Sequence, residues 1–469
     1  MKNIARFYRN YYEWINYAII AILCVLSCFF YDATWFLIGV VAVCACFYST
    51  EKLVSLTIVM YLIQMPLLPG LFPILMGFVM LMFLKNFLIS FFKRKQNISI
   101  KTLIVLLALI VYAIITHLIA PYTTFTYFII FISDIFILYF TFLARKEIDV
   151  LKITRIFIGA IIVTGVICLI SKFGMRFDKY NEWYTRTGYL KVWGMTENPN
   201  HYAGAVLIAI SSLLALFFFE KINLPEFVIT FVLLFIFGYL TISRNFLMAV
   251  LVALIIFGIC YIIKYKFKAF EVLVPLCAIV CSICLLFSDQ TSMYLHRVVH
   301  SYDAEGLEKA PEYDYDLIFA GLIDFNPGRI ALWKVYLKRI FQTPIFTLFG
   351  LGVTAIRLGR VHPHNAYIQW LYKLGIVGLI IVAILFYLMI REGITENHHK
   401  NRNKLFYTAI AILPLLFMLL FDVWNLVNVA TIIFLLSFVS CSEWKENSKF
   451  ENEEQTKMIK GLLKKPSKF

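Results

Sequence analysis

Residues 362–365 have the sequence His-Pro-His-Asn, and histidine is a residue type that acid–base chemistry uses. A histidine can take up a proton near neutral pH. The proline limits the backbone before His364, and Asn365 can cap a helix that begins at Ala366. We therefore predict that a rigid helix start presents the His364 imidazole at a surface. Gly375 and Gly378 then form a small face that packs closely against a neighbouring helix.

A second stretch, TISRNFL at residues 241–247, places Arg244 between two apolar runs with almost no loop. A guanidinium at the edge of a hydrocarbon layer is costly unless it is paired. Arginine binds phosphate oxygens in a bidentate manner, so an anion such as a diphosphate is the expected partner. The alternative is a contact with a lipid headgroup.

The segment 326–352, NPGRIALWKVYLKRIFQTPIFTLFGLG, predicts an amphipathic helix on a membrane surface. After Arg329, apolar residues recur at helical spacing and the cations fall elsewhere. Pro344 ends this helix, and Gly350 and Gly352 allow a tight return into the bilayer. The apolar positions are Ile330, Trp333, Leu337 and Ile340, and the cations are Lys334, Lys338 and Arg339.

The stretch GMTENPNHYAG at residues 194–204 precedes a further apolar run. Its Asn-Pro-Asn is a turn signal, and its side chains could bind sugar hydroxyls or could simply cap a helix. The candidate substrate-binding residues here are Glu197, Asn198, Asn200 and His201, with Arg186 in the segment before them and Asn365 in the histidine motif.

The elements that carry these motifs are membrane helices. The chain is 61% hydrophobic with a mean hydropathy of +0.82, well above the apolar content of a soluble domain. Its apolar runs are continuous, which favours helices over a barrel. We predict an all-α polytopic protein of about 12–14 spans with an outer-face loop that bears amphipathic helices. The spans begin near Trp14, Ala33, Leu53, Phe72, Thr102, Tyr127, Ile153, Tyr202, Phe227, Phe246, Phe270, Tyr367, Leu405 and Leu426.

The charge distribution predicts the orientation of these spans. The formal net charge is +15, but the basic residues segregate by membrane side, so nucleic acid is not an expected partner. With the N-terminus inside and strict alternation, most Lys and Arg lie on the cytoplasmic side. The membrane domain then covers residues 1–440, with outer loops at 172–200 and 289–365, and a basic cytoplasmic tail follows at 441–469. The first span lacks a cleavage site and is a retained anchor.

Metal and disulfide chemistry are not expected. The ten cysteines lie in spans or at their ends, so they indicate neither a disulfide framework nor a metal site. Asp314 and Asp316 form a short acidic pattern that is common in loops, and His296 and His300 lack a third ligand. No cofactor is predicted.

Asp134 stands in the middle of an apolar run. An intramembrane carboxylate is a functional candidate by default. We expect instead a structural hydrogen bond from Asp134 to another span.

The four motifs together resemble the O-antigen ligase and polymerase superfamily of bacterial envelope glycosyltransferases, over about residues 190–390. The spacing of His364, Asn365, Gly375 and Gly378 carries much of the resemblance, while Asn245 and Lys373 depart from the usual glycine and acidic residue. The resemblance implies a metal-independent, inverting transfer at the outer face of the cytoplasmic membrane. The charge pattern, by contrast, is what predicts that both termini are cytoplasmic.

The sequence hypothesis is transfer of a glycan from an undecaprenyl-diphosphate carrier to an acceptor hydroxyl. His364 accepts the proton, and Arg244 and Arg329 neutralise the diphosphate. Another lipid-linked repeat unit as the acceptor makes the protein a polymerase of capsule or O-antigen, which we favour, whereas lipid A core makes it a ligase. A transporter or flippase of lipid-linked oligosaccharide is the second alternative. Expected partners are the lipid-linked oligosaccharide, membrane lipids and a chain-length regulator or flippase.

Overall fold

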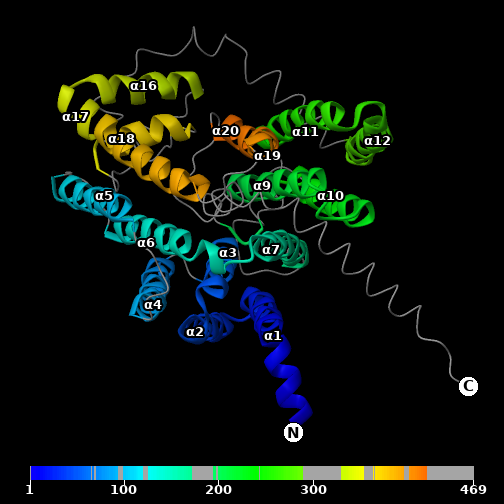
Figure 1. The fold of residues 1–469 in the computed structure, drawn as a ribbon, viewed down its shortest axis with the longest axis horizontal. Coiled ribbons are helices and arrows are strands. Elements are labelled where there is room, and N and C mark those ends of the chain that lie inside the picture. The colour runs from blue at the N-terminus through cyan, green and yellow to red at the C-terminus, as the bar shows by residue number, and fades with distance from the viewer. Residues whose placement is uncertain are drawn as a thin grey trace, which may run out of the picture.

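The computed structural model describes residues 2–64, 66–67, 70–92, 99–119, 125–171, 194–196, 199–241, 243–288, 329–352, 363, 365–395 and 401–419. These residues form helices and no strand (Figure 1). The helices are α1 Lys2–Phe29, α2 Tyr31–Phe47, α3 Thr50–Leu62, α4 Phe72–Phe92, α5 Ile100–Ile119, α6 Phe125–Leu143, α7 Val150–Ser171, α9 Pro199–Phe218, α10 Leu224–Tyr239, α11 Arg244–Tyr265, α12 Phe270–Leu286, α16 Arg329–Phe341, α17 Pro344–Phe349, α18 Ala366–Thr395, α19 Asn401–Tyr407 and α20 Leu413–Leu419. Short 3₁₀ segments follow α6 and α11, and a π-helical turn joins α19 to α20.

The predicted all-α polytopic membrane architecture is confirmed. Every predicted span coincides with a helix, except the one near Leu426, which lies outside the described residues. Within the described ranges, 7 helices are long and apolar enough to cross a membrane, and several shorter apolar helices accompany them. Helix α3, with 13 residues, reaches only about 20 Å at 1.5 Å per residue, less than a full hydrocarbon core.

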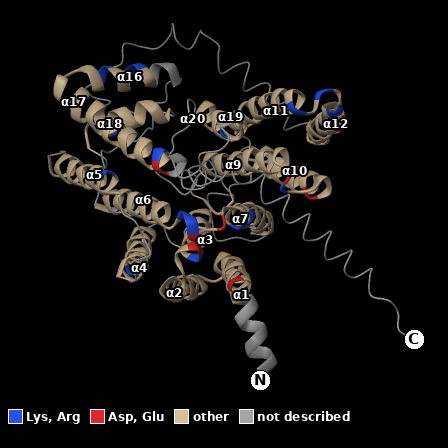
Figure 2. Cartoon of the chain, in the orientation of Figure 1, with Lys and Arg blue, Asp and Glu red and all other residues tan. Residues whose placement is uncertain are grey.

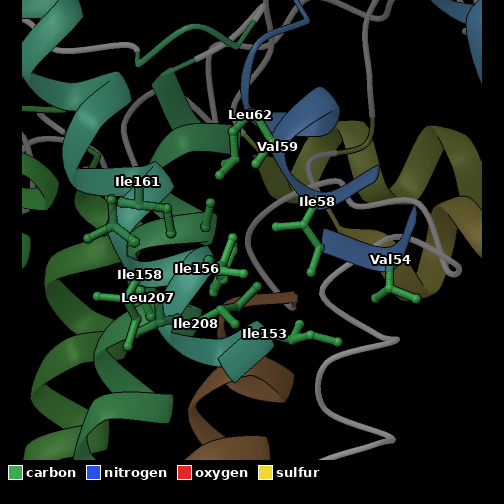
Figure 3. Packing of buried hydrophobic residues seen from close by; sticks show 14 of the residues in the cluster. Val54, Ile58, Val59, Leu62, Ile153, Ile156, Ile158, Ile161, Leu207 and Ile208 are labelled. Carbon is green, nitrogen blue, oxygen red and sulfur yellow. The ribbon is translucent and has the colours of Figure 1, made fainter. Parts of the chain in front are cut away.

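Helix α9 lies at the centre of the bundle. In its apolar window 89% of the residues are buried, and alanines and serines on this helix let its neighbours approach closely. Helix α7 packs against both α9 and α3 and thereby joins the N-terminal helices to the rest. Figure 3 shows this junction of aliphatic side chains, with Ile153, Ile156, Ile158 and Ile161 from α7, Val54, Ile58, Val59 and Leu62 from α3, and Leu207 and Ile208 from α9.

Charged residues gather mostly near the ends of helices, and long stretches of ribbon carry none (Figure 2). At one end of the bundle, Lys152 Nζ at the start of α7 contacts Glu13 Oε2 at 2.9 Å and Glu51 Oε1 at 3.2 Å. On the same stretch of α7, Arg155 Nε lies 3.8 Å from Glu226 Oε1 at the start of α10.

Lys264 at the end of α11 donates to the Phe218 carbonyl at 2.5 Å and to Glu220 Oε1 at 3.0 Å. Phe218 and Glu220 lie at the connection between α9 and α10, so Lys264 is on the same side as Glu226. We call this face of the bundle the Lys–Glu end, defined by Glu13, Glu51, Lys152, Glu220, Glu226 and Lys264. Alternating spans place these same helix ends on one side of a membrane, so the contacts agree with the predicted topology.

Asp134 makes the structural contact that was predicted. Its side chain is buried on α6 and accepts a hydrogen bond from the Tyr61 hydroxyl of α3. Lys85, a second charged residue within a span, donates to the Cys46 carbonyl at 2.5 Å, where the last carbonyls of α2 lack helical partners. Both groups therefore have a role in holding helices together.

Candidate functional site

Asn365 caps helix α18 as predicted. Its Oδ1 accepts from the Ile368 amide at 3.1 Å, and its backbone carbonyl accepts from Gln369 N at 3.0 Å. The side chain is buried. One of the first unpaired amides of α18 is thus satisfied by a side chain. His364, the residue before this cap, lies outside the described residues.

Helix α16 is fixed to the segment immediately before His364. The indole Nε1 of Trp333 donates to the Pro363 carbonyl at 2.8 Å. Arg329 is the first residue of α16 and stands four positions before Trp333, which is about 6 Å along the helix axis. The backbone of Arg329 is therefore about one helical turn from the level of the Pro363 contact, while its side chain lies outside the described residues.

The amphipathic helix differs from its prediction in two respects. Its apolar side does not lie on lipid alone, because α16 packs against α18, with the rings of Tyr336 and Tyr372 centred 5.0 Å apart in an edge contact. Pro344 does not end α16, which already stops at Phe341; it is instead the first residue of α17. A proline suits that position because its missing N–H would have had no helical partner.

The glycines of FGLG dock onto a break in α18. Gly375 has φ 60 and ψ −176, so the helix is interrupted there. The amides of Leu351 and Gly352 donate to the carbonyls of Tyr372 and Lys373 at 2.9 and 3.0 Å. These carbonyls lose their helical donors at the break, and the incoming loop replaces them.

The close approach explains why both partners are glycine. A Cβ on Gly350 would lie 2.5 Å from the Lys373 carbonyl oxygen, and a Cβ on Gly375 would lie 2.5 Å from the Leu348 oxygen. The prediction that Gly375 and Gly378 share one small helix face is therefore wrong for Gly375, which is not helical. It holds for Gly378, where a Cβ would meet the Tyr112 ring at 2.7 Å.

Tyr112 of α5 is a contributor to this dock that the sequence did not reveal. Its hydroxyl lies 2.7 Å from the Phe349 carbonyl and also contacts the Leu374 carbonyl, so two acceptors share one proton. The side chain is buried. In the sequence, Tyr112 is a tyrosine within the apolar run IVYAIITHL. Nothing in that run distinguishes it from the tyrosines of other spans.

Arg244 is the first residue of α11, as its place between two spans predicted. The turn before it is buried, with Thr241 Oγ1 donating to the Gly238 carbonyl at 2.6 Å and the Ser243 amide donating to Thr241 Oγ1 at 3.2 Å. Asn245 has no positive φ, so the turn does not require the glycine that is usual at that position. The Arg244 side chain lies outside the described residues.

Asn200 and His201 lie in the first turn of α9, and both are partly exposed. The next residue, Tyr202, is buried and its hydroxyl donates to the Ile161 carbonyl of α7 at 2.7 Å. Gly194, at φ +59, packs directly on the Tyr202 ring. Arg186, Glu197 and Asn198 lie outside the described residues.

Two of the predicted site residues, Asn200 and Arg244, share one end of the bundle. Phe218 and Lys264 belong to the Lys–Glu end, and Asn200 and Arg244 lie about 27 and 30 Å from them along α9 and α11. Both of these predicted residues are therefore far from the Lys–Glu end and on the same side of the bundle.

The start of α18 lies away from the Lys–Glu end. Phe406 of α19 lies beside Phe218, with ring centroids 4.9 Å apart, and the helix continues about 15 Å further to Leu416. The Leu416 carbonyl accepts from the Tyr367 hydroxyl at 3.1 Å. Tyr367 follows Asn365 by two residues, so the capped start of α18 is displaced from the Lys–Glu end by about 15 Å toward the end that carries Asn200 and Arg244.

The described ranges contain no group of three or more His, Cys, Asp or Glu side chains that could hold a metal ion.

A bundle of long apolar helices defines a multi-pass membrane protein. Residues 229–383 match the model of a protein family described as O-antigen ligase. This match covers roughly a third of the chain and confirms the resemblance to the O-antigen ligase and polymerase superfamily, which acts in polysaccharide biosynthesis. It includes Arg244, Arg329 and the histidine motif, and it excludes Asn200, His201 and Tyr112. No curated protein matches the chain.

Proposed function

We propose that this protein is a polysaccharide polymerase of the outer face of the bacterial cytoplasmic membrane. It transfers the growing glycan from an undecaprenyl-diphosphate carrier to a second lipid-linked repeat unit. The glycan product belongs to a capsule or O-antigen. A chain-length regulator or a flippase is its expected protein partner.

One observation supports the site above all others, namely the hydrogen bond from Trp333 to the Pro363 carbonyl. It holds the helix that begins with Arg329 against the segment that contains His364. Because Asn365 caps α18 on the other side of His364, the residues before and after this histidine are both held by hydrogen bonds. Such a supported position is what a catalytic group requires.

The transfer proceeds by attack of the acceptor hydroxyl on the anomeric carbon of the donor glycan. The new carbon–oxygen bond forms as the bond to the diphosphate breaks, and the hydroxyl proton passes to His364. The bonding electrons leave with undecaprenyl diphosphate, whose developing charge Arg244 and Arg329 neutralise. A cation placed for such charge contributes several kcal/mol in a water-poor site. Attack opposite the leaving group inverts the anomeric centre.

The remaining predicted residues bind the sugars. Asn200 and His201 lie partly exposed at the same end of the bundle as Arg244. Glu197, Asn198, Arg186 and the amide nitrogen of Asn365 complete the proposed set of substrate contacts. Amide and imidazole groups suit hydroxyl-rich ligands because each can donate and accept hydrogen bonds.

A ligase is the main alternative, and the description of the matched family as O-antigen ligase favours it. The two activities differ in the acceptor, which is a lipid-linked repeat unit for a polymerase and lipid A core for a ligase. The proposed roles of His364, Arg244 and Arg329 are the same in both.

A transporter is less well supported. Interrupted helices in transporters leave backbone carbonyls open to ions or substrates. In α18 the carbonyls of Tyr372, Lys373 and Leu374 are taken up by Leu351, Gly352 and Tyr112. The break in α18 therefore serves the docking of a loop.

The first experiment is complementation of a strain that lacks the gene. His364→Ala, Arg244→Ala and Arg329→Ala are expected to lower glycan formation by about 10²-fold or more. Lys334→Ala is the matched control for Arg329, because Lys334 lies on the same helix and is exposed. Normal polymer from the three site variants at normal membrane abundance contradicts the proposed chemistry.

A second experiment identifies the acceptor. Purified protein is incubated with lipid-linked repeat units alone, and chain length is read by gel and mass spectrometry. Growth of the glycan without another acceptor is the result expected for a polymerase. Transfer that requires added lipid A core identifies a ligase, and movement of intact substrate across vesicles without any new glycosidic bond identifies a transporter.

A further inference from the structure

A groove of about 720 Å³ lies between α1 and α2, and none of its lining residues is a candidate catalytic residue. The two helices are joined through Phe30 and pack against each other. Tyr12 and Asn16, in the first turns of the apolar span Tyr12–Phe29 of α1, line the groove together with Tyr48, which follows α2. The volume is within the range of small-molecule sites.

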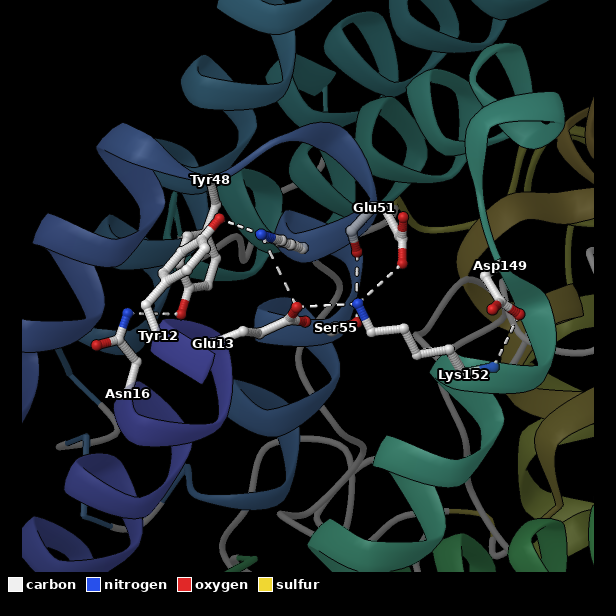
Figure 4. A network of polar contacts seen from close by, with 9 residues as sticks. Tyr12, Glu13, Asn16, Tyr48, Glu51, Ser55, Asp149 and Lys152 are labelled. Atoms are coloured by element: carbon white, nitrogen blue, oxygen red, sulfur yellow. Dashed lines mark hydrogen bonds and ion pairs between the residues drawn. The ribbon is translucent and has the colours of Figure 1, made fainter. Parts of the chain in front are cut away.

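Polar groups gather at one end of this groove. The Asn16 amide donates to the Tyr48 hydroxyl at 3.0 Å, and the rings of Tyr12 and Tyr48 meet edge to face at 6.3 Å (Figure 4). The ammonium of Lys52 hydrogen bonds to the Tyr12 hydroxyl and lies 3.9 Å from the centre of its ring. Burial raises the pKa of Tyr48 above its ordinary value, so this phenol stays neutral beside an anion.

The rest of the groove is apolar and open on the outside of the bundle. Trp35, Phe36 and Phe47 line it and are 51%, 69% and 83% exposed. In a membrane-spanning helix such side chains face lipid. The distance from Trp35 to Phe47 along α2 is about 18 Å, close to the ~15 Å depth of one hydrocarbon leaflet. The groove thus has the length of one acyl chain with a polar group at its end.

The position of the polar end excludes the proposed glycan donor as the occupant. Tyr12 and Lys52 adjoin Glu13 and Glu51, which belong to the Lys–Glu end. Arg244 and Asn200 lie at the opposite end of the bundle. A lipid diphosphate bound for catalysis would therefore place its headgroup on the other side of the membrane from Tyr12.

The charged side chains at the polar end balance each other, and it is the basic sequence before Tyr12 that favours an anionic headgroup. Lys52 and Lys152 are balanced by Glu13 and Glu51, which contact them. The sequence of α1 before Tyr12 contains three basic residues and no acidic one, so this stretch is positively charged. The basic residues are Lys2, Arg6 and Arg9. A basic segment beside a membrane surface attracts anionic lipid.

We propose that the α1–α2 groove binds one anionic phospholipid, with an acyl chain along Trp35–Phe47 and the phosphate at Tyr12, Asn16, Tyr48 and Lys52. This site is independent of the proposed glycosyl transfer. It uses helices outside the matched family region and lies on the membrane side that the charge pattern predicts to be cytoplasmic.

Gly39 provides a direct test of the groove. It lines the groove, and a Cβ added there meets no atom within 4 Å. Gly39→Leu therefore fills the acyl-chain space without a clash in the protein. Gly159→Leu is a matched control, because Gly159 is also an exposed helical glycine with no atom within 4 Å of an added Cβ, but it lies on α7. Val43→Trp narrows the same groove from a different position and serves as the second variant.

The measurement is photolabelling of the full-length protein in phosphatidylcholine vesicles that contain phosphatidylglycerol with a diazirine in its acyl chain. Labelled peptides are mapped by mass spectrometry. Labelling of residues 31–48 is expected to fall at least fivefold in Gly39→Leu and Val43→Trp and to stay within twofold in Gly159→Leu. A diazirine phosphatidylcholine probe is expected to label this segment several-fold less than phosphatidylglycerol.

Four results overturn the proposal. Equal labelling of residues 31–48 in wild type and both groove variants shows bulk lipid contact only. Equal labelling by the two phospholipid probes removes the anionic preference. Stronger labelling by a polyprenyl phosphate probe identifies a polyprenyl chain as the occupant. Absence of lipid labelling in wild type, with a change of oligomeric state in Gly39→Leu, identifies a second copy of the chain.

Discussion

The substitution Gly375→Ala tests whether the break in α18 holds the FGLG loop. Gly375 has φ 60, a left-handed conformation that a residue with a Cβ rarely adopts. An alanine Cβ at this position would lie 2.5 Å from the Leu348 oxygen. Alanine also has the best intrinsic preference for a continuous helix. The variant is therefore expected to straighten α18 and release the loop.

The expected change follows from the backbone conformation that residue 375 adopts in the docked and in the released state. A left-handed backbone costs an alanine roughly 1–2 kcal/mol. Alanine also stabilises the continuous helix of the released state by about 1 kcal/mol relative to glycine. A sum of about 2–3 kcal/mol corresponds to a change of about 10²-fold in the equilibrium between docked and released loop.

Hydrogen exchange measured by mass spectrometry reads this equilibrium at the amides of Leu351 and Gly352. Their protection is expected to fall by about 10²-fold in Gly375→Ala, and glycan formation is expected to fall with it. Gly159→Ala is the control, since a Cβ there meets no atom within 4 Å. Unchanged protection of Leu351 and Gly352 in Gly375→Ala refutes the docking role of the break.

Three further predictions concern the hydrogen bonds around the site and the bundle. Tyr112→Phe removes the one proton shared by the Phe349 and Leu374 carbonyls, so loop protection is expected to fall about tenfold; unchanged exchange would contradict the contact. Trp333→Phe keeps an aromatic ring but loses the hydrogen bond to the Pro363 carbonyl, and it is expected to lower kcat about tenfold with little change in KM. An effect on KM alone would argue against a role of Trp333 in positioning the histidine segment. Asp134→Leu leaves the Tyr61 hydroxyl without its acceptor and is expected to destabilise the protein by about 1–3 kcal/mol, seen as a lower Tm in detergent; the double variant Tyr61→Phe, Asp134→Leu should recover part of that loss.

Local features of the fold could be read from the sequence. Runs of apolar residues predicted the helices because a span must satisfy its own backbone hydrogen bonds in lipid. Asn365 predicted a cap because its short side chain reaches the amide three residues ahead, as its bond to Ile368 confirms. The start of α11 at Arg244 followed in the same way from a short polar turn between two apolar runs.

Contacts between distant segments could not be read in this way. Tyr112 meets Phe349 across 237 positions and Leu374 across 262, and no local pattern specifies such a pairing. Gly375 was expected to be helical because G-x-x-G is typical of packed helix faces. The structure instead uses its freedom at positive φ to open the helix, which only the approach of the Gly350 loop explains.

The contact between Tyr112 and α18 also shows why the matched region alone does not hold the FGLG loop at the break in α18. Residues 229–383 contain the loop and the broken helix, but the hydroxyl that joins their carbonyls comes from Tyr112 on α5. Without that donor, the Leu374 carbonyl beside the break loses a buried partner, at a cost of about 1–3 kcal/mol. A hydrophobic replacement at Tyr112 would therefore favour closure of α18 into a regular helix, because only the helical amides could then satisfy the carbonyl. The broken conformation of α18 thus depends on α5 as well as on the two glycines, and an exchange of residues 229–383 between relatives should preserve the loop only when the recipient supplies a donor at this place on α5.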